Sequence, residues 1–160
     1  MALGIEVLIL CILLFLMCFL GTGSDLKNIK SFKSYPLELR DLLLKDEDFK
    51  DKIKPTNPLM VFGSNLILFL IIFFICGSFF RQKEFLPNFV GLLILGMSIN
   101  LFDLLVIDLI WWRNTKRSRF KNYPDKKLYS DPREHIYAFF RGALMYLIIA
   151  LIDGALLMLF

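Results

Sequence analysis

Three polar side chains interrupt a long apolar stretch, and they are the residues of this sequence best suited to chemistry. Residues 89–112 read FVGLLILGMSINLFDLLVIDLIWW and contain Asn100, Asp103 and Asp108. A carboxylate at the centre of a membrane helix costs roughly 2.5–3.5 kcal/mol on insertion scales, so such groups face the protein interior and often serve a function. Carboxylates at successive depths are what a relay of protons or cations needs.

Further polar groups lie in the other apolar stretches at comparable depths. Arg141 falls near the depth of Asp108, and a guanidinium can hold a carboxylate bidentately in a low-dielectric interior. We therefore expect an ion pair between Arg141 and Asp108, which either fixes the helix register or takes part in function. The predicted intramembrane polar cluster consists of Glu6, Asn65, Asn100, Asp103, Asp108, Arg141 and Asp153.

The spacing within residues 89–112 predicts how these groups point if the helix is an α-helix. Asn100 and Asp103 are three residues apart and share a face. Asp103 and Asp108 are five apart, which separates them by about 140° around an α-helix. We therefore expect that the two aspartates do not point at one spot. Asp103 has no cation at its depth, so it either carries a proton or faces a water-filled cavity.

The composition shows which elements must position these residues. The chain has 160 residues, of which 57% are hydrophobic and 17 are phenylalanine, and this excludes a soluble domain of ordinary composition. Runs of about 20 apolar residues predict membrane-spanning helices. Four such runs occur, at 2–20, 59–80, 89–112 and 136–160. The first is predicted to be a retained helix rather than a signal peptide, because MALGIE lacks a basic segment.

The basic residues predict the orientation of these helices. Residues 24–57 and 113–134 carry eight Lys and Arg each, whereas the 81–88 connection carries two. Since basic loops stay on the cytoplasmic side, both long loops are predicted to be cytoplasmic and both termini to lie outside. We predict an all-α integral membrane four-helix bundle, a single transmembrane domain over residues 1–160, in the cell (inner, cytoplasmic) membrane.

The first long loop carries its own helical pattern. Its apolar residues fall on one helical face, bounded by Pro36 and Pro55, which are typical of helix ends. The residues of this face are Leu39, Leu42, Leu43, Phe49 and Ile53. The pattern predicts an amphipathic helix that lies on the membrane or on the other inner loop.

The second long loop has an excess of basic residues, eight against three acidic ones. This pattern either binds anionic lipid headgroups or a phosphate, or is the ordinary positive-inside signal. The residues that could bind headgroups are Lys116, Arg117, Arg119, Lys121 and His135. Nucleic acid is not expected as a partner of a surface this close to the bilayer.

Metal and cofactor signals are weak. Cys11, Cys18 and Cys76 are isolated, without a C-x-x-C pair, and are interpreted as packing residues. The acidic run DEDFKD at 46–51 lacks the glycine and the terminal glutamate of a calcium loop. The sequence therefore predicts neither a metal ion nor a cofactor.

One resemblance bears on the C-terminal half. The run NLFDLLVIDLIWW at 100–112, the basic loop and the Arg141–Gly142 pair resemble a set of small, uncharacterised bacterial four-span membrane proteins. The resemblance implies a four-span architecture. It carries no known activity.

Three functional hypotheses follow. The leading one is a small membrane transport or channel-like component that uses the intramembrane cluster. It would be a homo-oligomer or would join a partner membrane protein, because four helices enclose little lumen. The alternative is a lipid-modifying enzyme at the cytoplasmic face, with Asp108, His135 and Arg141 as base, acid and phosphate clamp. The third is a non-catalytic subunit of a membrane complex. No H-E-x-x-H or G-x-S-x-G motif supports an enzyme.

Overall fold

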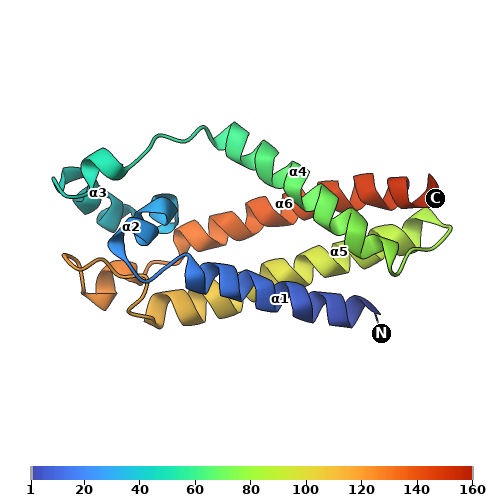
Figure 1. The fold of residues 1–160 in the computed structure, drawn as a ribbon, viewed down its shortest axis with the longest axis horizontal. Coiled ribbons are helices and arrows are strands. Elements are labelled where there is room, and N and C mark those ends of the chain that lie inside the picture. Colours follow the sequence, from blue (N-terminus) through green and yellow to red (C-terminus); the bar gives the residue numbers. More distant parts are fainter. Residues whose placement is uncertain (1, 160) are drawn as a thin grey trace. The chain divides into compact units, whose positions relative to one another are not determined.

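The computed structural model describes residues 2–159 as a chain of helices joined by turns and short loops (Figure 1). The long helices are α1 (Ala2–Leu20), α4 (Pro58–Ser78), α5 (Phe85–Phe102) with its continuation η3 (Asp103–Trp112), and α6 (Arg133–Leu156) with the terminal turn η5 (Leu157–Leu159). Between residues 2 and 159 there is no β-strand, only an isolated bridge between Phe120 and Tyr123. The prediction of an all-α chain is confirmed.

Four helices are long and apolar enough to cross a membrane, at Leu3–Leu20, Pro58–Ser78, Phe85–Trp112 and Lys126–Leu159. The chain is therefore a membrane protein by length and composition of its helices. Their ends follow local chemistry. Pro58 occupies the first turn of α4, and the Asn57 side chain accepts a hydrogen bond from the backbone N–H of Leu59 at 2.9 Å. The predicted fourth run extends to residue 160, which lies outside the described residues.

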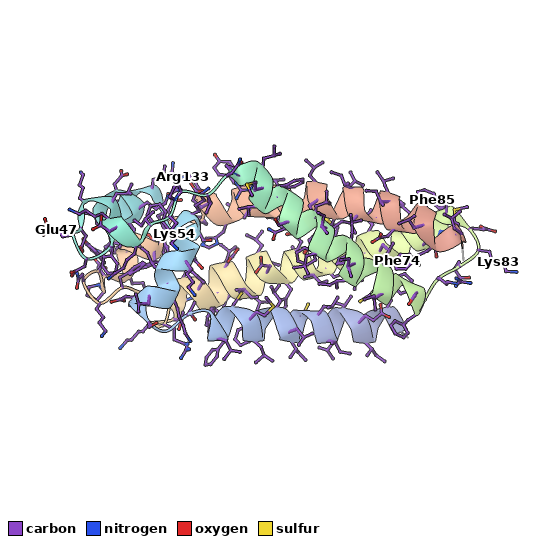
Figure 2. The ribbon with its side chains drawn as sticks, turned by 45° about the horizontal axis from the view of Figure 1, so that its top comes forward. Glu47, Lys54, Phe74, Lys83, Phe85 and Arg133 are labelled. Carbon is purple, nitrogen blue, oxygen red and sulfur yellow. The ribbon has the colours of Figure 1, made fainter. Side chains whose placement is uncertain are left out.

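The connection between α4 and α5 is short and is closed by one buried side chain. The Asn88 amide donates to the carbonyl of Gln82 and accepts from its N–H, at 2.9 and 2.6 Å. Figure 2 labels Lys83 in this turn and Phe85 where α5 begins. The buried amide thus ties the first turn of α5 to the segment that leads into it, as a tight connection between consecutive helices requires.

The third membrane helix differs from the prediction in its winding. Residues Asp103–Trp112 form a ten-residue π-helix, η3, rather than a continuation of the α-helix. A π-helix closes its hydrogen bonds from residue i to residue i+5, so residues five apart share one face, as residues four apart do in an α-helix. The predicted angle of about 140° between Asp103 and Asp108 assumed α-helical winding. It is therefore wrong.

The chain divides into two compact units, each described separately. The first comprises Met1–Ile12, Thr56–Leu101 and Phe140–Phe160, and the second comprises Leu13–Pro55 and Phe102–Phe139. The first unit thus holds α4, most of α5 and most of α6. The second unit holds η3, the beginning of α6 and both long loops.

In the first unit, glycines let the helices approach closely. A Cβ at Gly154 would lie 3.2 Å from the backbone of Phe89, and a Cβ at Gly142 would lie 2.6 Å from Asn100 Oδ1. Small residues at such crossings are typical of membrane helices, whose association depends on close packing rather than on the hydrophobic effect. The Tyr146 ring, stacked on Phe73 at 5.2 Å between centroids, fills the space between α6 and α4.

In the second unit, the two long loops pack on one another. The first loop contains α2 (Asp25–Asn28), η1 (Ile29–Ser34), α3 (Leu37–Lys45) and η2 (Lys50–Lys52), and the second contains η4 (Lys126–Tyr129). Their shared core, here called the loop core, consists of Ile29, Tyr35, Leu39, Leu43, Phe49, Trp112, Phe120 and Tyr129. The amphipathic pattern of the first loop thus buries its apolar face against the other loop.

Helix α3 ends well before Pro55, because an aspartate turns the chain. Asp46 leaves the helical conformation, and its Oδ1 accepts the backbone N–H of Asp48 at 2.8 Å. Its Oδ2 accepts the Tyr123 hydroxyl at 2.9 Å and so links the two loops. The hydrogen bond from Asp48, followed by those from Asn122 and Tyr123, holds the pKa of the Asp46 carboxyl below its ordinary value.

The lowered pKa of Asp46 predicts a pH-dependent contribution to stability. A carboxyl whose pKa is lower in the folded state stabilises the fold above its unfolded pKa, about 4, and loses that contribution as pH falls through the folded pKa. We expect Asp46→Asn to unfold at a lower temperature than wild type at pH 7. The gap should close on acidification below pH 4. Thermal unfolding in detergent over a pH series measures this difference.

The matched control for that series is Asp51→Asn. The described part of the structure shows no hydrogen bond to the Asp51 carboxylate, and the residue is exposed on the same loop. This variant should follow the wild-type curve at every pH. A gap between Asp46→Asn and wild type that stays constant with pH would show that the contribution of Asp46 does not come from its charge.

Candidate functional site

The candidate site is an acid–histidine pair at the end of η3. His135 Nδ1 lies 3.0 Å from Asp108 Oδ1, and the two side chains are only 6% and 14% exposed. Both residues belong to the second unit. A contact of this length, in these positions, is a hydrogen bond or ion pair shielded from solvent. We refer to it as the Asp108–His135 pair.

The start of α6 fixes the position of His135. The Asp131 carboxylate accepts the backbone N–H of Arg133 at 3.0 Å, just before the first turn of the helix. Arg133, labelled in Figure 2, begins α6 two residues before His135. In the same turn, Glu134 pairs with Arg40 of α3 at 2.8 Å, with both side chains about one-fifth exposed. The first loop thus holds the turn that carries the histidine.

Aromatic packing closes one side of the pair. The Trp112 ring meets the His135 ring edge-on, with 6.2 Å between centroids, and Trp112 is itself 7% exposed. Trp112 also contacts Tyr35, at 5.5 Å between centroids. The pair therefore lies next to the loop core. A restricted, apolar surrounding strengthens a hydrogen bond between charged or polar partners.

The second aspartate belongs to the same site because of the π-helix. Asp103 and Asp108 are five residues apart on η3 and so lie on one face. Asp103 interacts electrostatically with both Asp108 and His135. Cys18 of α1 interacts electrostatically with both aspartates, so its thiol lies near them. The site, here called the η3 site, comprises Cys18, Asp103, Asp108 and His135.

The η3 site contains two carboxylates and an imidazole that interact electrostatically with one another. Such groups exchange protons readily, and an imidazole can accept a proton on one ring nitrogen while it releases one from the other. Among residues 2–159, no group of three or more His, Cys, Asp or Glu side chains has the geometry of a metal site. The chemistry that these side chains offer by themselves is proton transfer.

The structure gives Asp108 a partner that the sequence did not predict. His135 pairs with Asp108, and Arg141 is an exposed side chain on α6 in the first unit. Arg141 was expected beside Asp108 because the two residues have similar predicted depths in the membrane. Depth does not determine the direction in which a side chain points around its helix. His135, expected as a headgroup ligand or as the acid of a lipid-modifying enzyme, is buried and paired with Asp108.

The other predicted cluster residues occupy separate positions in the first unit. Asn100 is 7% exposed and packs where Gly142 leaves room for it. Asp153 is 1% exposed, and its Oδ2 has no hydrogen-bond partner. Glu6 is half-buried and interacts electrostatically with Cys76. Asn65 is exposed on α4.

Two of the basic residues proposed for headgroup binding hold the second loop in place. The Arg117 guanidinium donates to the carbonyls of Phe19 and Thr22, at 3.1 and 3.2 Å, and lies 3.9 Å from the Phe19 ring. It thereby satisfies carbonyls at the C-terminal end of α1. Arg119 donates to the carbonyls of Pro124 and Asn114. Lys116 and Lys121 are exposed, so their side chains are accessible to an anionic lipid headgroup.

Comparisons with other proteins identify no relative of this chain. No family model matches it, and neither a curated protein nor a solved structure is significantly similar to it.

Proposed function

We propose that this chain is a small transport or channel-like membrane component that passes protons through Asp103, Asp108 and His135. The observation that carries the proposal is the 3.0 Å contact of the Asp108–His135 pair, with Asp103 on the same face of η3. Ionisable residues inside membrane helices are expensive, and a consecutive series of them is typical of proton relays. The order along the path is Asp103, Asp108, His135.

The charge distribution supports a direction for this path. The two loops with eight basic residues each favour the cytoplasmic side, so η3 runs inward and both termini lie outside. In this orientation Asp103 lies near the middle of the bilayer, and the Asp108–His135 pair lies toward the cytoplasm. We propose the cell membrane as the location, and a homo-oligomer or a partner membrane protein as the functional state.

The test of this proposal is proton flux into liposomes that contain the purified chain. A potassium diffusion potential drives the flux, and a trapped pH-sensitive dye reports it. Asp103→Asn should reduce the flux at least about tenfold, because an amide cannot carry a proton between the groups on either side of it. Unchanged flux in Asp103→Asn, with the variant reconstituted in equal amount, would contradict the relay.

The control carboxylate is Asp51, which lies outside the membrane helices. Asp51→Asn changes the net charge by the same amount and should leave the flux unchanged. The comparison separates loss of a carrier from a general effect of charge on the membrane potential near the protein.

The same pair favours a second candidate, a membrane-embedded enzyme that acts on lipid. A carboxylate hydrogen-bonded to one ring nitrogen orients a histidine for general acid–base catalysis. The exposed Lys116 and Lys121 would then attract the anionic headgroup. An enzyme would consume lipid without dissipating a proton gradient, so the flux assay and lipid analysis of the same liposomes distinguish the two.

A further inference from the structure

Helix α4 packs on α6 along one side and carries exposed residues elsewhere on its surface. Its packed side carries Phe69 and Phe73, whose rings lie 5.5 and 5.2 Å from that of Tyr146. It also carries Gly77, where an added Cβ would lie 2.6 Å from Leu157. These three residues all lie in the second half of α4, the helix labelled in Figure 1.

A regular row of residues runs along α4 outside its packed side. The row, here called the α4 seam, consists of Val61, Asn65, Leu68, Ile72 and Ile75, all exposed except Ile72, which is half-buried. Val61, Leu68 and Ile75 are 47%, 52% and 55% exposed. The intervals of four, three, four and three residues are those of a heptad repeat, which lets one helix pack along another over its whole length.

One member of the seam is polar. Asn65 is the eighth residue of α4, about 10 Å from the helix start at 1.5 Å per residue, and so lies within the membrane span. Its side chain is exposed, and no hydrogen bond to its amide is found within residues 2–159. An amide left without a partner in hydrocarbon costs several kcal/mol. The seam therefore needs a partner that supplies both a donor and an acceptor at this depth.

We propose that the partner is a second copy of this chain, joined through α4 in a parallel homodimer. Two copies inserted in the same orientation bring equal residues to equal depth, so Asn65 of one copy meets the same residue of the other. An amide is both donor and acceptor, so the pair satisfies itself across a two-fold axis. A single Asn at a core position of a heptad seam fixes the register of the helices and the number of helices that associate in this way.

The first test compares variants of Asn65 by native mass spectrometry and by sedimentation in detergent. The wild-type chain should be a dimer. Asn65→Leu, which keeps the branched shape without the amide, should weaken association about 3- to 20-fold, the range for one hydrogen bond between membrane helices. Asn65→Gln should keep the dimer. Ser64→Ala, which removes an exposed hydroxyl one residue away, should leave it unchanged.

The second test places single cysteines along α4 of the full chain, with Cys11, Cys18 and Cys76 replaced by alanine. In membranes, oxidation should cross-link copies that carry cysteine at 61, 65, 68, 72 or 75. Copies with cysteine at 67 or 71, which lie off the seam, should stay uncross-linked. Cross-links that peak at 67 or 71, a monomeric wild-type chain, equal association of Asn65→Leu and wild type, or a different protein at fixed ratio would each overturn the proposal.

Discussion

Replacing Asp108 by asparagine should lower proton flux by about a hundredfold or more. Positioned side chains that accept and donate protons contribute about 10²- to 10⁴-fold to the steps they catalyse, and the introduced amide could not take a proton from Asp103 or from His135. The amide keeps the size of the side chain and one oxygen for His135, so the fold should survive. The same liposome assay measures the effect, with reconstituted protein quantified for each variant.

The pair also predicts how the effects of its two residues combine. His135→Gln should lower the flux to a similar extent, and Asp108→Asn with His135→Gln should be little worse than either alone, because both changes break one path. Arg141→Gln, at an exposed position of the first unit, should retain most of the flux. A multiplicative loss in the double variant would show that the two residues act independently.

Tyr35→Ala should be the most destabilising single change in the loops, by about 3–5 kcal/mol, the range for deleting a large buried ring. Tyr35 is fully buried at the centre of the loop core, with its ring 5.2 to 5.9 Å from those of Trp112, Phe120 and Tyr129. Its loss leaves a cavity between the two loops. Thermal unfolding in detergent, followed by tryptophan fluorescence, measures the change because Trp112 lines that cavity.

A milder change separates the hydroxyl of Tyr35 from its ring. The hydroxyl donates to the carbonyl of Ser118 at 2.8 Å, and both groups are buried. Tyr35→Phe leaves that carbonyl without its partner and should cost about 1–3 kcal/mol. Tyr137→Phe removes a hydroxyl from a tyrosine that is 58% exposed and should cost little. Equal stability of Tyr35→Phe and Tyr137→Phe would contradict the role assigned to this hydrogen bond.

The helices were predictable because long apolar runs have few alternatives in a chain of this length. The helix ends were less predictable, since α4 stops at Ser78 and α6 begins at Arg133 for local reasons of capping and turn chemistry. The loop core could be predicted from the sequence only in part. The apolar face of the first loop is a sequence pattern, but the sequence left open whether that face meets lipid or the other loop.

The two aspartates of the candidate site were predictable from the sequence, whereas Cys18 and the geometry of the site were not. Asp103 and Asp108 were identified from the cost of a carboxylate in a membrane, whereas their shared face depends on π-helical winding. A run that is apolar all round carries no periodic signal to distinguish π from α winding. The predicted spans place His135 and Asp108 at a similar depth in the membrane. That similarity was the only feature of the sequence that pointed to a contact between them. The role of Arg40, which pairs with Glu134, had no signal, because it depends on a contact between residues far apart in the chain.

The most direct test of the central claim is the proton permeability of liposomes that contain only the purified wild-type chain. We expect a voltage-driven pH change faster than in liposomes of the same lipid without protein. The rate should be the same whether sodium or choline is the external cation, because the η3 site is proposed to carry protons. A rate equal to that of protein-free liposomes would contradict the proposal that Asp103, Asp108 and His135 form a proton path.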